Sequence, residues 1–207
     1  MNRASVEQFC HALACYGHST GAPSLARSKQ ANTVIAVELP STRFLAPPAL
    51  EQASRLAVRV RESMGMGASD PVDIEAMVLE LGWQVQKRHL DADWGGVQAL
   101  MAPAASGFLF VVDPRPSPSC PSRSLNVDAE VLERALFCRR LAHELGHVFF
   151  YDTGRPARRL LRHSEAEEKY CDAFAAALLL PSQEPDSWVA PSAAEWISHW
   201  GTHPALF

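Results

Sequence analysis

The sequence lacks any apolar run long enough to cross a membrane. Its longest apolar runs, residues 107–112 and 173–180, fall far short of the roughly 20 residues that a spanning helix needs. Near the N-terminus, Glu7 and His11 interrupt the stretch that a secretory signal would keep continuously apolar. We therefore expect a cytoplasmic protein with no membrane partner.

The chain also lacks a surplus of positive charge and an even number of cysteines. It has 19 Lys and Arg against 23 Asp and Glu, a formal net charge of -4 at pH 7, which argues against direct binding to nucleic acid. Its five cysteines match no disulfide scaffold, which favours reduced thiols in a cytosolic protein. The length of 207 residues suits one domain, or one domain plus an appendage. The oligomeric state stays open.

Apolar spacing divides the chain into two parts. Residues 1–47 give no clear pattern, and we treat them as an N-terminal extension of uncertain structure, followed by one domain over residues 48–207. The periodicity of this domain predicts an α+β fold with a small three-stranded sheet packed on helices. The predicted helices cover residues 49–64, 71–81, 127–151 and 165–180, and the predicted strands cover residues 83–89, 97–101 and 108–112.

Helix boundaries are predicted from capping residues. Asp70 followed by Pro71 is typical of an N-cap and a first helical position. Asn126 is the predicted cap of the long helix. Ser164 and Glu167 form a capping box for the last long helix, which Pro181 should end.

The long helix carries the motif His143-Glu144-Leu145-Gly146-His147. Histidines at i and i+4 lie on one helical face, one turn apart, so both can reach a single ion. Zinc suits two neutral imidazoles and tetrahedral geometry. Glu144 lies about 100° round the helix, where it can contact a water molecule at the metal. The flanking residues are mostly apolar, and a buried helix needs partners for two His and one Glu, which a metal supplies.

A hydrolytic zinc needs a third protein ligand and one open position. Glu168 on the next helix is our candidate, although Glu165 and Glu167 compete with it on spacing alone. Asp172 follows Glu168 at i+4 on the same face, where it can accept the second ring N–H of a zinc-bound histidine.

At this point the sequence resembles the ImmA/IrrE-type metallopeptidases over about residues 52–183. Residues 139–147 (RRLAHELGH) and 168–181 (EKYCDAFAAALLLP) carry the likeness, together with the pattern upstream of them. The register of the second motif selects Glu168 as the third ligand. Cys171 and Asp172 stand where Ala and Asn are usual in the family, and Asp113 stands where an Asn often ends the last strand.

The resemblance implies a zincin-like fold, a gluzincin-like site with one zinc ion per chain, and a regulatory protease. Several relatives cleave a repressor of the helix-turn-helix type, so the expected partner is a protein or peptide substrate of that class. In the expected mechanism zinc lowers the pKa of a water, and Glu144 takes its proton and later passes it to the leaving amine.

Two further features of the cleft are expected. Tyr151, His163 and Tyr170 are candidates for stabilising the oxyanion of the transition state, because they lie near the motifs in sequence. The strand over residues 108–112 is our expected sheet edge for an extended substrate. Two other functions stay open: a zinc hydrolase of a small molecule, and a zinc-binding interaction module without catalysis. The second is disfavoured because a purely structural site has no use for Glu144.

Overall fold

The computed structural model describes residues 49–67, 70–90, 96–104, 107–116, 128–152, 155–159 and 164–180. Its elements, in chain order, are α3 (Ala49–Ser63), α4 (Ile74–Glu80), β1 (Gln84–Lys87), β2 (Ala99–Ala104), β3 (Gly107–Val112), α5 (Ala129–His147), the 3-10 turn η4 (Val148–Phe150), β4 (Tyr151–Asp152), β5 (Arg155–Arg159) and α6 (Glu165–Leu179). The predicted N-terminal extension, Asn126 and His163 lie outside the described residues.

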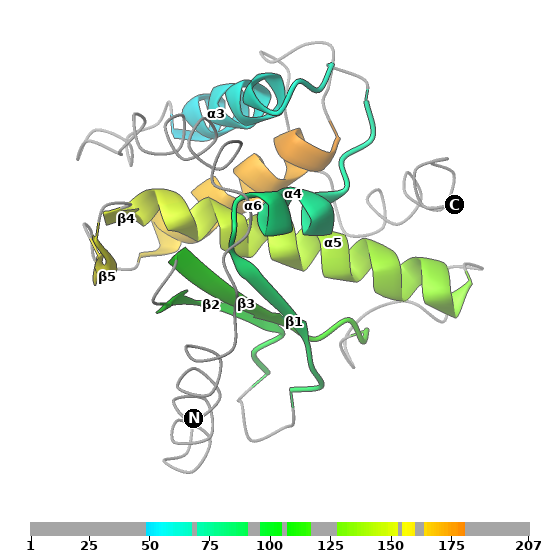
Figure 1. Cartoon of the computed structure of the whole chain (residues 1–207). Coiled ribbons are helices and arrows are strands. Elements are labelled where there is room, and N and C mark those ends of the chain that lie inside the picture. The colour runs from blue at the N-terminus through cyan, green and yellow to red at the C-terminus, as the bar shows by residue number, and fades with distance from the viewer. Residues whose placement is uncertain are drawn as a thin grey trace.

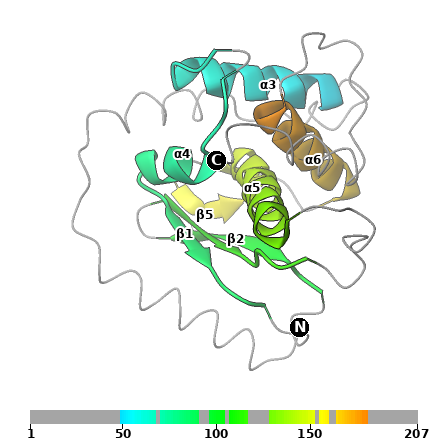
Figure 2. The same ribbon diagram turned by 90° about the vertical axis from the view of Figure 1, so that its right-hand side faces the viewer.

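The described elements form an α+β arrangement in layers, as the periodicity predicts. The long helix α5 crosses the middle, with α6 and then α3 on one side of it (Figure 1). Figure 2 shows α5 nearly end-on, between those helices and the sheet. No helix in the described part of the chain combines the length and apolar character that a membrane crossing needs.

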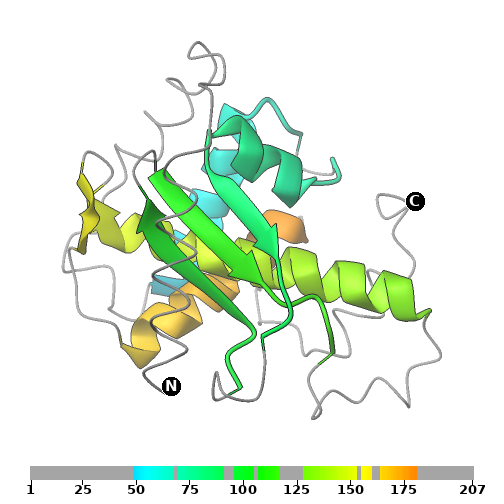
Figure 3. The same ribbon diagram turned by 60° about the horizontal axis from the view of Figure 1, so that its bottom comes forward.

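Three strands form the main sheet in the order β1-β3-β2 (Figure 3). β3 pairs in parallel with β1 and antiparallel with β2. The expectation that residues 108–112 form a sheet edge is therefore wrong, because β3 is the central strand. Every residue of β3 is buried, which explains its continuous apolar sequence, and β2 lies at the edge beside α5.

The helix ends refine the predicted boundaries. The cap of α4 is Asp73, whose Oδ1 accepts from the backbone N–H of Ala76 at 3.1 Å. The prediction of Asp70 is wrong, because its side chain closes the preceding turn by accepting from the N–H of Gly67 at 2.6 Å. The cap of α6 is Ser164, as predicted. α5 ends at His147, four residues earlier than the periodicity indicates, because the chain tightens there into η4.

The interface between α5 and α6 is unusually close at one glycine. A Cβ on Gly146 would lie 3.1 Å from the backbone Cα and the Sγ of Cys171. Beyond this point Phe149 packs edge-on against Phe174, with ring centroids 5.2 Å apart. Because Gly146 has no Cβ, the two helices can lie close together at this point of the motif.

Candidate metal centre

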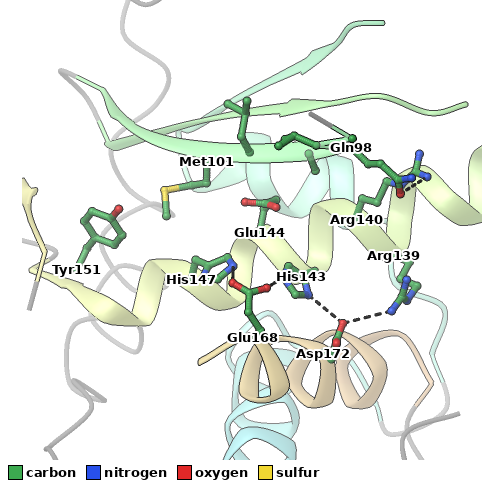
Figure 4. A pocket seen from close by; sticks show the side chains of 14 residues that line it. Gln98, Met101, Arg139, Arg140, His143, Glu144, His147, Tyr151, Glu168 and Asp172 are labelled. Carbon is green, nitrogen blue, oxygen red and sulfur yellow. Dashed lines mark hydrogen bonds and ion pairs between the residues drawn. The ribbon is translucent and has the colours of Figure 1, made fainter. Parts of the chain in front are cut away.

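The motif histidines occupy the last turns of α5, where their rings lie on one face. Their ring centroids are 5.0 Å apart, and potential ligand atoms of His143, Glu144 and His147 lie within 4.8 Å of one another. Figure 4 shows both rings directed towards α6, whereas Glu144 points towards β2. The carboxylate of Glu144 is therefore offset from the two rings around the helix, as the 100° rotation per residue requires, and it remains close enough to face the same cleft.

Glu168 on α6 faces both imidazoles. Its Oε2 lies 3.1 Å from Nε2 of His143, and its Oε1 lies 3.5 Å from Nε2 of His147. In a tetrahedral zinc site with bonds near 2.1 Å, neighbouring ligand atoms are roughly 3.4 Å apart. The two distances from Glu168 to the imidazole nitrogens are close to this value, and each is made by a different carboxylate oxygen.

The other ring nitrogen of each histidine contacts a second carboxylate of α6. Nδ1 of His143 lies 3.0 Å from Oδ1 of Asp172, and Nδ1 of His147 lies 2.6 Å from Oε1 of Glu167. These contacts orient the rings with Nε2 towards Glu168, which is the arrangement that metal-binding histidines need.

Sequence reasoning placed Asp172 in this position but treated Glu167 as a capping residue and as a rival ligand. Glu167 is 0% exposed, and it approaches His147 from the side away from Nε2. A buried carboxylate needs a specific partner, and its place one residue before Glu168 puts it on an adjacent helical face. The position of Glu167 next to Glu168 in the sequence could have indicated a contact with His147. That inference requires the orientation of α6, which the sequence alone does not supply.

The electrostatics around His143 favour a positive charge on its ring. Burial alone would lower the pKa of His143, but hydrogen bonds to Asp172 and Glu168, with the charges of Glu144 and Asp172, raise it to about 9. Burial would raise the pKa of Asp172, yet His143 and Arg139 together lower it. The same carboxylates that favour a proton on this ring would favour a bound cation.

A cleft of about 570 Å³ lies over the cluster, between β2 on one side and α5 with α6 on the other (Figure 4). Its lining comes from the segment 96–101, from Arg139, Arg140, His143, Glu144 and His147 of α5, from Tyr151, and from Glu168 and Asp172 of α6.

The three candidates for oxyanion stabilisation are placed differently. Tyr151 lines the cleft at the end of α5. Tyr170 is 0% exposed, packs edge-on against Phe150 in the core and is not among the residues that line the cleft. His163 lies outside the described residues.

Polar contacts that the sequence did not reveal fix one end of the cleft. The buried Arg140 donates from Nη2 to the side-chain oxygen of Gln98 at 2.6 Å. Its Nη1 donates to the backbone carbonyl of Arg115 at 2.7 Å and also to the backbone carbonyl of Asp113. Asp113 in turn accepts from the side chain of Arg115 and from the N–H of Leu90. Arg140 thus connects the metal-site helix to the start of β2 and the end of β3.

Comparison with known proteins bears directly on this site. Residues 107–192 match the family model described as the IrrE N-terminal-like domain, a peptidase family, and this span includes both motif helices. No curated protein and no solved structure matches the chain. The match indicates a metallopeptidase, and it confirms the resemblance of the chain to the ImmA/IrrE family over residues 107–192.

Proposed function

We propose that this protein is a zinc-dependent endopeptidase with a zincin-like fold, whose single zinc ion is held by His143, His147 and Glu168. One observation carries the proposal. The Nε2 atoms of both histidines and the carboxylate of Glu168 converge at 3.1 and 3.5 Å, while Asp172 and Glu167 occupy the Nδ1 atoms behind them.

Zinc bound by these residues would supply a Lewis acid that acidifies water and polarises a peptide carbonyl. Glu144 lines the cleft on the face of α5 directed towards β2, so its carboxylate stands between the metal ligands and the space for a substrate (Figure 4). In our proposal this carboxylate accepts the proton of the attacking water and delivers it to the leaving nitrogen. Tyr151 is the remaining candidate to donate a hydrogen bond to the developing oxyanion.

The position of β2 favours a peptide over a small molecule as the substrate. Among the strands that the structure describes, β2 pairs only with β3, and its N-terminal half lines the cleft. Such an edge can bind an extended segment through main-chain hydrogen bonds. The ImmA/IrrE resemblance extends this to a substrate class, and we propose a helix-turn-helix repressor, which a cytoplasmic protease would meet directly.

The test measures zinc content and cleavage of a co-encoded helix-turn-helix repressor by the full chain and by Glu144→Gln. We expect about one zinc per chain in both proteins, with cleavage by the wild type alone. Glu133→Gln is the matched control, because Glu133 is an exposed residue on the same helix outside the cleft lining.

The outcomes separate the alternatives. Equal cleavage by Glu144→Gln would overturn the assigned base. Zinc binding without cleavage of any protein would favour the interaction module, and zinc-dependent hydrolysis restricted to small esters or amides would favour the small-molecule hydrolase. A chain that binds no zinc would refute the metal centre itself.

A further inference from the structure

The two ends of the cleft differ in chemistry. Gln98, Arg139 and Arg140 gather at the end where the motif begins, whereas Met101 and Tyr151 lie at the other end, beyond His147 (Figure 4). A peptide that lies along β2 would therefore meet a polar, cationic environment on one side of the metal site. It would meet a thioether and an aromatic ring on the other side.

Positive charge outweighs negative charge at the polar end. The side chain of Arg139 is 39% exposed, and its Nη2 lies 3.2 Å from Oδ1 of Asp172. Arg140 is buried behind Gln98. Among the described residues that line this end of the cleft, two guanidinium groups stand against the one carboxylate of Asp172, and Arg139 is the more exposed of the two.

The backbone of β2 limits where a peptide can pair. The N–H of Asp113 donates to the carbonyl of Gln98 at 2.8 Å, and β2 runs antiparallel to β3 with Ala99 opposite Val112. Backbone groups alternate sides along a strand, so those of Gln98 and Leu100 point towards β3, and those of Ala99 and Met101 point to the open edge. Pro103, the next residue in this series, has no N–H to donate.

These constraints fix the direction of a bound peptide if it pairs antiparallel, the more stable arrangement per residue. β2 runs from the Gln98 end of the cleft to the Met101 end (Figure 4). The N-terminal part of the peptide would then lie beside Met101 and Tyr151, and its C-terminal part would lie beside Gln98 and Arg139.

We propose that the cleft selects an extended peptide segment with an acidic side chain on the C-terminal side of the metal site, bound by Arg139. An apolar side chain on the N-terminal side packs against Met101 and Tyr151. This specificity rests on the proposed peptide cleft, although it does not depend on turnover. It assigns Arg139 as a specificity-determining residue.

Binding is measured first, without turnover. Zinc-loaded full-length Glu144→Gln is immobilised and exposed to a mixture of capped peptides that carry Asp or Asn, and Glu or Gln, at each position. We expect acidic peptides to be enriched about fivefold over their amide counterparts, the ratio that an exposed ion pair of about 1 kcal/mol supplies. The preference should disappear when Arg139→Gln is added and should largely return with Arg139→Lys.

Arg134→Gln is the matched control, because Arg134 is an exposed arginine on α5 outside the cleft lining. It should leave the enrichment unchanged. Zinc content is measured for every variant, because Arg139 contacts Asp172 and through it His143. Loss of preference with zinc retained separates charge recognition from damage to the metal site.

Direction is measured by photo-crosslinking of the enriched peptides. A photoreactive group at the N-terminal end of the peptide should label the segments that contain Met101 and Tyr151, and a group at the C-terminal end should label the segment that contains Arg139. The reverse labelling, an absence of acidic enrichment, or enrichment that survives Arg139→Gln would each overturn the inference. Acidic peptides that bind as expected but are never cleaved by the wild type would leave it standing and refute the endopeptidase.

Discussion

The two walls of the cleft are held in place by different forces. The helical wall, formed by α5 and α6, is fixed by apolar packing, with Gly146 against Cys171 and Phe149 against Phe174. The strand wall is β2, most of whose residues are only half-buried, and Arg140 fixes its start through Gln98. The proposed metal ligands therefore stand on closely packed helices, and the proposed peptide-binding edge is held by its backbone pairing with β3 and by the Arg140 contacts at its start.

The largest effect that this comparison predicts is on folding stability. Phe174→Ala on the helical wall should lower the free energy of unfolding by about 3–5 kcal/mol, because the deletion leaves a cavity beside Phe149. Leu100→Ala on the half-buried strand wall should cost clearly less. Urea unfolding followed by circular dichroism measures both, and equal costs would contradict the division into two walls.

The second largest effect is a loss of zinc affinity, caused by a substitution in the helical wall. Glu167→Gln should raise the dissociation constant for zinc about 10- to 100-fold, because the buried carboxylate orients His147. Competition with a chromophoric chelator measures this constant. Glu165→Gln, a change two residues earlier at an exposed position of the same helix, should leave zinc affinity unaltered. Unchanged affinity in Glu167→Gln would mean that its contact with His147 does not support the metal.

The strand wall should respond to pH through Asp113. Burial alone would raise the pKa of Asp113, but hydrogen bonds from Arg115 and from the Leu90 amide, with the charge of Arg115, hold it well below its usual value. A carboxyl whose folded pKa is depressed contributes stability above its unfolded pKa of about 3.9, and this contribution is lost as pH falls towards the folded pKa.

Asp113→Asn should therefore lower the free energy of unfolding at pH 7 by about 1–3 kcal/mol, the cost of weakening charged hydrogen bonds. The difference from the wild type should shrink as pH falls below about 4. Denaturant titrations at a series of pH values between neutral and acidic measure it. A difference independent of pH would show that Asp113 acts through packing rather than through its charge.

The smallest predicted effect is on peptide binding, and it tests which residues of β2 face the open edge. Ala99→Pro removes an N–H that points away from β3, so peptide binding should weaken about fivefold, the value of one hydrogen bond of about 1 kcal/mol. Thermal stability should change little. Leu100→Pro removes an N–H that points towards β3 and should destabilise the fold instead. If both variants unfold alike, the assignment of inward and outward residues on β2 is wrong.

Short-range chemistry accounts for what the sequence could predict. Spacing at i and i+4 places His143 and His147 together on any helix. Ser164 marks the start of α6 because its side chain accepts from the nearby N–H of Glu167. Asp70 and Asp73 shared the same cap chemistry, and only the turn closed by the Gly67 amide decides between them.

Strand order depends on long-range pairing, yet the sequence contains indications of which strand is central and which lies at an edge. The uninterrupted apolar run of β3 indicates a strand buried on both faces, and Pro103 is typical of an edge strand. The role of Arg140 was not accessible in this way, since its acceptors at Gln98, Asp113 and Arg115 are distant in the chain.

Pro103 also bears on aggregation of the protein at high concentration. An unpaired strand edge is a template for a second copy of the same strand and hence for aggregation through growing intermolecular sheets. Because Pro103 has no N–H, an added strand cannot continue its full hydrogen-bond ladder along β2. Pro103 thus shortens the ladder that an added strand can form on this edge, which disfavours the growth of an intermolecular sheet there.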